Sequence, residues 1–295
     1  MRVLKDSDVI FSDGTFKTAP PPYVQLYTLH GVVRDRRIPL VFALLTSKNT
    51  QAYVRVLRII DRFLRHNHQV HFTPQRFIVD FELGFINAVN AEIPAVTVGG
   101  CHFHFCKRLY KKVQDLGLQG AYGNDNDVKK FVLMMMALAF LPRNVVIVCY
   151  NNLRTTPAVF NINANLFITY PALAAFCQYI EATWLRGSYP IALWNVYRRA
   201  NNERTSNVCE GWHHRFNRRV AIVHPNVWRF IIHLQKEEMH IRRAIRRSER
   251  GANPPPQKRK YVDLNNRIDN ARQAYQNNLP LNLYWRQIRH VCHRF

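Results

Sequence analysis

Five short apolar runs between residues 9 and 98 constrain the fold of this chain more than any other feature of its sequence. The first three are separated only by turn-forming or charged residues, which is typical of an antiparallel meander. A helical pattern from Tyr53 to Leu64 stands between the third run and the fourth. The last two runs are therefore predicted to be parallel strands of a mixed α/β sheet. The runs cover residues 9–11, 23–29, 38–45, 77–79 and 95–98.

The sequence after the fifth run changes from strand signals to helical ones. Residues 126–200 contain helical segments, including a buried helix predicted at Phe131–Leu141, and no clean strand pattern. Two amphipathic helices are predicted at Asn207–Ala221 and Asn226–Arg250, and Trp228 is expected to be a core residue. We expect the first part of an α/β core, an all-helical insertion, the completion of the core, and a Pro-rich linker with a basic polar tail. In the same order these regions are 1–110, 111–203, 204–250 and 251–295.

Positive charge dominates the chain, which has 42 Lys and Arg residues, 19 Asp and Glu residues and a formal net charge of +23. Residues 181–295 alone hold 22 basic and 8 acidic side chains. Such a charge favours a polyanion, above all nucleic acid, as the partner. DNA-backbone contacts are predicted for four arginines of the second amphipathic helix, the alternative being that they are only its solvated face. They are Arg242, Arg243, Arg246 and Arg247.

Composition excludes several classes of protein. With 295 residues and 47% apolar side chains the chain can bury a sizeable core, so it is not disordered throughout. No apolar run reaches the roughly 18 residues that a membrane-spanning helix needs. The first ten residues lack the apolar core of a signal peptide. We expect the chain to stay inside the cell, with its six cysteines reduced.

Two aspartates come at the ends of apolar strands in a chain with few acids. Asp13 follows the first run and Asp80 the fourth. If these strands are neighbours, the two carboxylates lie about 4.8 Å apart and repel each other unless a cation such as Mg²⁺ lies between them. Glu210 is the natural third ligand, because its surroundings contain few acids and many basic residues. The alternative is that each acid is a turn former, a helix cap or an ion-pair partner.

These acids belong to segments that follow one another in a characteristic order. The segments are residues 13–20 (DGTFKTAP), 25–31 (QLYTLHG), 79–82 (VDFE), 100–105 (GCHFHF) and 205–212 (TSNVCEGW). Over about residues 6–239 the chain resembles the transposase domain of Mutator-like elements (MULE), which are DDE-type transposases. The resemblance implies a ribonuclease H-like α/β fold with a helical insertion and a helical C-terminal region. It also implies that Asp13, Asp80 and Glu210 bind two divalent ions, Mg²⁺ or Mn²⁺. Ser206 departs from the family, where a second Asn is commoner.

Two further groups in these segments have more than one interpretation. Glu82 competes with the second aspartate of the triad, but that aspartate directly follows the apolar run. We therefore interpret Glu82 as an acid behind the metal ligands or at a helix N-terminus. Cys101 and His104 match a Cys-x-x-His pair of the family. With His102 and Cys106 alongside, they suit either packing beside the carboxylates or a Zn²⁺ site. A zinc site would need Cys209 and His213 as well, so Mg²⁺ or Mn²⁺ is the favoured metal.

The resemblance implies a metal-dependent transposase that cuts and joins DNA in the nucleus, with element terminal repeats and target DNA as its partners. The alternative is a domesticated or truncated DNA-binding regulator without cleavage activity. It is considered because the chain begins just before the first predicted strand, which leaves no room for an N-terminal zinc-finger reader. A structural RNA-binding protein would fit the charge but would leave the three acids unexplained. A homodimer is a further partner that the sequence leaves open.

Overall fold

The computed structural model describes residues 2–34, 36–253 and 256–292, and the chain divides into two compact units. The first unit consists of Met1–Cys101 and Thr205–Pro256, and the second of His102–Arg204 and Gln257–Phe295. Within the described ranges, no helix is both long enough and apolar enough to cross a membrane.

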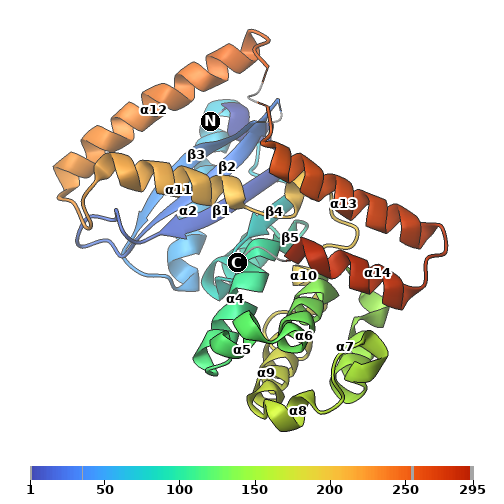
Figure 1. Ribbon diagram of the computed structural model, residues 1–295. Helices are drawn as coiled ribbons and strands as arrows, with labels where there is room; N and C mark the ends of the chain where they lie inside the picture. The colour runs from blue at the N-terminus through green and yellow to red at the C-terminus, as the bar shows by residue number, and fades with distance from the viewer. Residues whose placement is uncertain (1, 35, 254–255, 293–295) are drawn as a thin grey trace. The chain divides into compact units, whose positions relative to one another are not determined.

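The first unit is built on a mixed five-stranded sheet in the order β3-β2-β1-β4-β5 (Figure 1). The pairs β1–β2 and β2–β3 are antiparallel, and the pairs β1–β4 and β4–β5 are parallel. The predicted meander followed by two parallel strands is therefore confirmed, as is the prediction that the first and fourth strands are neighbours. The strands are β1 (Val9–Thr15), β2 (Gln25–Val33), β3 (Arg36–Leu45), β4 (Arg76–Val79) and β5 (Thr97–Gly100).

The edge of the sheet accommodates a proline. Pro39 lies in β3, an edge strand, where a missing N–H does not interrupt the interior of a sheet. The register between β2 and β3 shifts at Leu29/His30, where His30 pairs with Pro39 and Leu29 with Val41. This bulge lets the rest of the long β2–β3 ladder keep its pairing.

Helices cover both faces of the sheet, because successive residues of a strand point to opposite sides. On one face the aromatic rings of Tyr27, Tyr53 and Phe85 pack together and bring in α2 (Thr50–His68) and α3 (Leu83–Glu92). On the other face Leu26 packs with Trp212, Phe216, Val220 and Phe230 of α11 (Asn207–Val220) and α12 (Val227–Glu249). The short α1 (Arg2–Lys5) precedes the sheet.

The prediction that Trp228 is a core residue is wrong. Its side chain is 74% exposed, whereas Phe230, two positions later, is 1% exposed. Two positions turn the direction of a side chain by about 200° around a helix, so the two residues lie on opposite sides of α12. Only the side of α12 with Phe230 and Ile241 is buried.

The second unit is entirely helical in its described part, around the apolar segment that includes Phe131–Leu141. All eleven of these residues are buried, first in α6 and then in a 3₁₀ turn, so the predicted buried helix is confirmed with a tighter end. The α-helices of this unit are α4 (His102–Asp115), α5 (Gln119–Asn124), α6 (Asn126–Ala137), α7 (Val146–Thr155), α8 (Leu166–Thr169), α9 (Ala172–Ile180), α10 (Ile191–Trp194), α13 (Arg259–Gln276) and α14 (Leu281–Ile288).

The C-terminal residues are part of this second unit, whereas the sequence suggested a separate polar tail. Tyr284 Oη donates a hydrogen bond to the carbonyl of Phe140 at 2.9 Å, and Trp285 Nε1 donates to that of Met134 at 2.9 Å. Both aromatic rings are buried, which explains why a mostly polar segment folds back on the insertion. The first of the two segments that form the first unit ends at Cys101, whereas the sequence suggested residue 110. Pro254 and Pro255 of the expected linker lie outside the described residues.

Candidate active site

The register of β1 and β4 brings Asp13 and Asp80 to the same edge of the sheet. The strands are parallel, with Phe11 paired to Ile78. Asp13 comes two residues after Phe11, and Asp80 comes two residues after Ile78, directly beyond the end of β4. Both acids therefore lie two positions beyond the last pair of the β1–β4 ladder, on parallel strands that run in the same direction. The sequence suggested that Asp13 ends its strand, but β1 continues to Thr15 and Asp13 pairs with Thr28 of β2.

Helix α11 brings Glu210 to Asp13. Cys209, in the first turn of α11, packs against Phe11 and Ile78 on the sheet and fixes where this helix begins. A carboxylate oxygen of Glu210 lies within 4.8 Å of a carboxylate oxygen of Asp13. Burial, followed by the charge of Asp13 and more weakly that of Glu210, raises the pKa of the Cys209 thiol well above its usual value. Cys209 is therefore a neutral packing residue beside two acids.

Asp13 is held by a buried polar chain that the sequence did not reveal. Its Oδ1 accepts a hydrogen bond from the Gly14 N–H at 2.9 Å, and its Oδ2 lies 3.3 Å from His213 Nδ1. The other ring nitrogen of His213, Nε2, is 3.1 Å from Thr28 Oγ1, which in turn is 3.1 Å from His30 Nε2. The side chains of Asp13 and His213 are only 7% and 8% exposed, so water does not compete for this contact.

A spacing signal for His213 was present in the sequence. His213 follows Glu210 by three positions on α11, and residues three apart share a helix face. From the sequence, His213 is expected only as a possible zinc ligand, because nothing in the pattern of β2 indicates that Thr28 would meet it.

His30 is neutral at the inner end of this chain. Burial, and then the charges of His213 and Arg215, lower the pKa of His30 well below its ordinary value. The unfolded chain takes up a proton on this histidine below about pH 6.5, whereas the folded chain does not. The contribution of neutral His30 to the free energy of unfolding is therefore fully present above the pKa of this histidine in the unfolded chain. It is lost as the pH falls below that pKa.

We expect acid to reduce the free energy of unfolding by up to about 1.4 kcal/mol per pH unit below pH 6.5 through His30 alone. Urea unfolding at pH 7.5 and pH 5.5 measures this slope, and His30→Gln removes the contribution. An equal slope in wild type and His30→Gln would contradict the assignment.

The carboxylate of Glu82 is held by hydrogen bonds from neighbouring side chains. Glu82 is the N-cap residue of α3, which agrees with its interpretation as a helix N-terminal acid. Its carboxylate accepts hydrogen bonds from Tyr53 Oη at 2.5 Å and from Gln25 Nε2 at 3.3 Å. Burial, the hydrogen bond to Glu82 and the charges of Glu82 and Asp80 raise the pKa of Tyr53, so its hydroxyl stays a donor.

Cys101 and His104 fall in different units of the chain. Cys101 directly follows β5 and is buried in the first unit, where its Sγ accepts a hydrogen bond from the Ser206 N–H at 3.2 Å. That bond ties the end of β5 to the residue that precedes α11. His104 lies in the first turn of α4, in the second unit.

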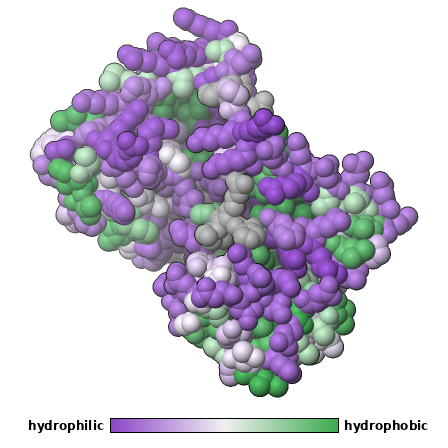
Figure 2. Space-filling model, viewed as in Figure 1, coloured by the Kyte–Doolittle hydropathy of each residue, from purple (hydrophilic) through white to green (hydrophobic). Residues whose placement is uncertain are grey.

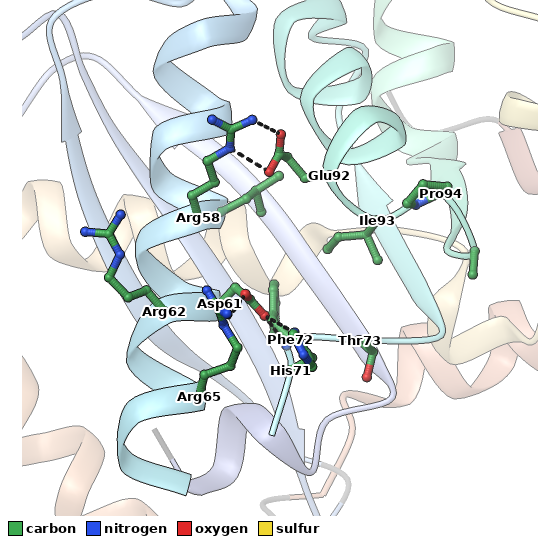
Figure 3. A pocket seen from close by; sticks show the side chains of 12 residues that line it. Arg58, Asp61, Arg62, Arg65, His71, Phe72, Thr73, Glu92, Ile93 and Pro94 are labelled. Atoms are coloured by element: carbon green, nitrogen blue, oxygen red, sulfur yellow. Dashed lines mark hydrogen bonds and ion pairs between the residues drawn. The ribbon is translucent and has the colours of Figure 1, made fainter. Parts of the chain in front are cut away.

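A pocket of about 480 Å³ in the first unit, between α2, α3 and the loop before β4, is a different kind of site (Figure 3). Its acids already have cationic partners. Arg58 holds both oxygens of Glu92 at 2.9 Å, and Arg65 contacts Asp61 at 3.0 Å. Burial alone would raise the pKa of Asp61, but hydrogen bonds from the Phe72 N–H and from His71 keep this pKa below its usual value. The pair of Arg58 and Glu92 joins α2 to α3, and the pair of Arg65 and Asp61 lies within α2. Both acids that line this pocket are therefore already in ion pairs.

Asp13 and Glu210 suit a hard divalent ion as ligands. Mg²⁺ binds oxygen at 2.0–2.1 Å in octahedral geometry, so two of its ligands lie about 3 to 4 Å apart. The separation of at most 4.8 Å between the two carboxylates comes within a small side-chain adjustment of this range. Two carboxylates at this distance repel each other, and a cation removes that repulsion.

Comparison with known proteins adds the family. Residues 9–108 match the family model of the MULE transposase domain. This segment of the chain is a MULE transposase domain. It contains Asp13, Asp80, Cys101 and His104, whereas Glu210 lies beyond it. The family indicates a transposase-related function with DNA as the partner. No curated protein matches the chain.

The four arginines expected to contact DNA are all exposed on α12. Arg242 is in contact with Glu238, one turn earlier on the same helix. Figure 2 shows hydrophilic side chains along the part of the first unit where α12 ends, at the top of the view.

Proposed function

We propose that this chain is a DDE-type transposase of ribonuclease H-like fold that cleaves DNA strands and transfers them in the nucleus, with Asp13, Asp80 and Glu210 as the metal-binding acids. The observation that carries this proposal is the meeting of Asp13 and Glu210, which come from β1 and α11 and have oxygens within 4.8 Å. The order of the sheet and the MULE transposase domain at residues 9–108 support it.

The three acids would hold Mg²⁺ or Mn²⁺ at the edge where β1 and β4 end. Bound divalent ions supply the activation of water or of a DNA 3′-hydroxyl and the stabilisation of the leaving oxygen. Asp13 is fixed for this task by the Gly14 N–H on one oxygen and by His213 on the other. Glu210 is carried by a helix anchored through Cys209, so its backbone position is fixed as well.

The exposed arginines of α12 would hold the phosphate backbone of element ends and of target DNA. Arginine side chains contact phosphate oxygens without regard to sequence, and each contact releases counterions. The acids and these arginines both belong to the first unit.

We expect replacement of the four α12 arginines by Ala to weaken binding to any DNA sequence and to reduce the slope of log K against log[salt] by up to about 3.6, at 0.9 per phosphate contact. A fluorescence-anisotropy salt titration measures this slope. An unchanged slope would mean that this face of α12 is only solvated. A matched control removes the same charge from exposed arginines of α2 and should leave the slope nearly unchanged: Arg55, Arg58, Arg62 and Arg65.

The test of the proposal is strand transfer by the purified full chain on pre-nicked terminal-repeat DNA at low salt, with Mg²⁺, with Mn²⁺ and with EDTA. Pre-nicked substrate at high concentration separates weak target affinity from a lack of chemistry. Products that require the metal and disappear in Asp13→Asn support the proposal. DNA binding without any metal-dependent product would overturn it and leave a DNA-binding regulator without cleavage activity.

A further inference from the structure

A second cluster of ligand-type side chains lies buried in the all-helical unit. His102 and Cys106 are one turn apart on α4, so they share a helix face. Cys292 comes to them from the 3₁₀ turn Arg289–Cys292 that follows α14. His102 is 3% exposed, Cys106 is fully buried and Cys292 is 2% exposed. One ligand atom from each lies within 4.8 Å of the other two.

The distances between these atoms fit tetrahedral zinc coordination. With Zn–N near 2.0 Å and Zn–S near 2.3 Å, ligand atoms around one zinc lie about 3.5 Å (N to S) and about 3.8 Å (S to S) apart. His102 Nε2 is 3.4 Å from Cys106 Sγ and 3.9 Å from Cys292 Sγ. One nitrogen therefore faces both sulfurs at the spacing that a shared metal ion requires.

A backbone contact holds the ring of His102. The ring donates a hydrogen bond to the backbone of Met136, which must be the carbonyl because the bond favours the protonated ring. A ring N–H bound to a backbone carbonyl, with the other nitrogen on the metal, is the usual arrangement of histidine ligands.

The charge of the complex suits its buried position. Two thiolates and one neutral imidazole around Zn²⁺ have no net charge, so the complex avoids most of the cost of burying a charge. Within the described ranges, the cluster has these three members among His, Cys, Asp and Glu side chains. A water molecule is then the fourth ligand, as in zinc sites with three protein ligands.

We propose that His102, Cys106 and Cys292 bind one Zn²⁺ ion that fastens the 3₁₀ turn after α14 to α4. This site shares no residue with the proposed carboxylate site, and it is distinct from the Cys101 and His104 pair. It gives the C-terminal segment a second attachment to the unit, beside the hydrogen bonds of Tyr284 and Trp285. Because the ligands come together only in the folded chain, metal binding adds to folding stability.

The experiment measures zinc in the full chain, purified under reducing conditions and dialysed against a trace of Zn²⁺. We expect inductively coupled plasma mass spectrometry to find one zinc ion per chain. After exchange for Co²⁺ we expect thiolate-to-cobalt charge-transfer bands and the intense visible bands of tetrahedral cobalt. Cys106→Ser and Cys292→Ser should lose affinity by about 100-fold or more. Cys177→Ser is the matched control, because Cys177 is buried in the same unit outside the cluster.

Thermal unfolding with and without a chelator compares each variant with itself, so a variant of lower stability can still be tested. Chelation should lower the unfolding midpoint of wild type and of Cys177→Ser, but not that of Cys292→Ser. A wild-type chain without zinc, or with a Cys106–Cys292 disulfide in place of the metal, would overturn the proposal. Full zinc content in both Cys106→Ser and Cys292→Ser would overturn it too, since the ion would then lie elsewhere.

Discussion

Asp80→Asn should abolish metal-dependent DNA cleavage by this chain while leaving DNA binding intact or slightly stronger. The substitution keeps the size of the side chain and removes the charge that would hold the metal, and it also removes one repulsion toward phosphate. We expect the rate of strand transfer to fall by about 10³-fold or more, because several kcal/mol of charge stabilisation in the transition state are lost. Single-turnover assays on pre-nicked DNA measure this rate, and a filter-binding assay follows the affinity.

Glu82→Gln is the matched control, since Glu82 follows Asp80 by two residues and carries the same charge. Its carboxylate already accepts hydrogen bonds from Tyr53 and Gln25, and glutamine can still accept one of them. Activity should therefore remain measurable in this variant. An inactive Glu82→Gln beside an active Asp80→Asn would reassign the second acid without changing the mechanism. Asp13→Asn and Glu210→Gln should behave like Asp80→Asn.

Much of the first unit could be predicted because its signals are local. Apolar runs and helical spacing predicted the strand order. The position of Asp80 directly after its strand was predicted as well, whereas Asp13 was expected to end the first strand and instead lies inside β1, paired with Thr28. Glu210 was placed through the resemblance, since no local pattern connects α11 to β1. In the structure, α11 is held against the sheet by the packing of Cys209 on Phe11 and Ile78. This tertiary contact cannot be read from local sequence patterns.

The polar chain behind Asp13 could not be predicted for the same reason, and neither could the approach of Cys292 to His102 and Cys106 in the proposed zinc cluster. His213 meets Thr28, and Cys292 meets His102, across separations that neither helical nor strand periodicity can encode. The tail was misjudged because its polar composition outweighs Tyr284 and Trp285, the two buried aromatic residues that attach it to α6 and the 3₁₀ turn after it. The exposure of Trp228 shows that residue type alone does not decide which side of a helix is covered.

Glu237→Ala should strongly destabilise the chain, because this carboxylate on α12 fixes α11 to it. Glu237 is 2% exposed and accepts hydrogen bonds from Trp212 Nε1 at 2.7 Å, Arg215 at 3.1 Å and Arg219 at 2.5 Å. Trp212 in turn stacks on Phe216 with ring centroids 4.9 Å apart. These contacts hold the helix that carries both Glu210 and His213.

The size of this effect follows from what each partner loses. The buried Trp212 N–H would have no acceptor, which costs about 1–3 kcal/mol, and the two arginines would lose a charged partner. Both arginine side chains are about half exposed, so water screens their share and it stays below the 3–5 kcal/mol of a fully buried pair. We expect the free energy of unfolding to fall by about 3 kcal/mol for Glu237→Ala and by about half of that for Glu237→Gln, which can still accept from Trp212.

Glu238→Gln is the natural comparison for Glu237, since it is the next residue on the same helix and has the same charge. Its side chain is 45% exposed and pairs only with Arg242 on the surface, so its replacement should change stability by less than about 0.5 kcal/mol. Urea unfolding followed by tryptophan fluorescence measures both variants. Equal effects at the two positions would mean that α11 is held by its apolar contacts alone. A large effect at Glu237 only would show that one buried carboxylate on α12 holds in place the helix that carries Glu210.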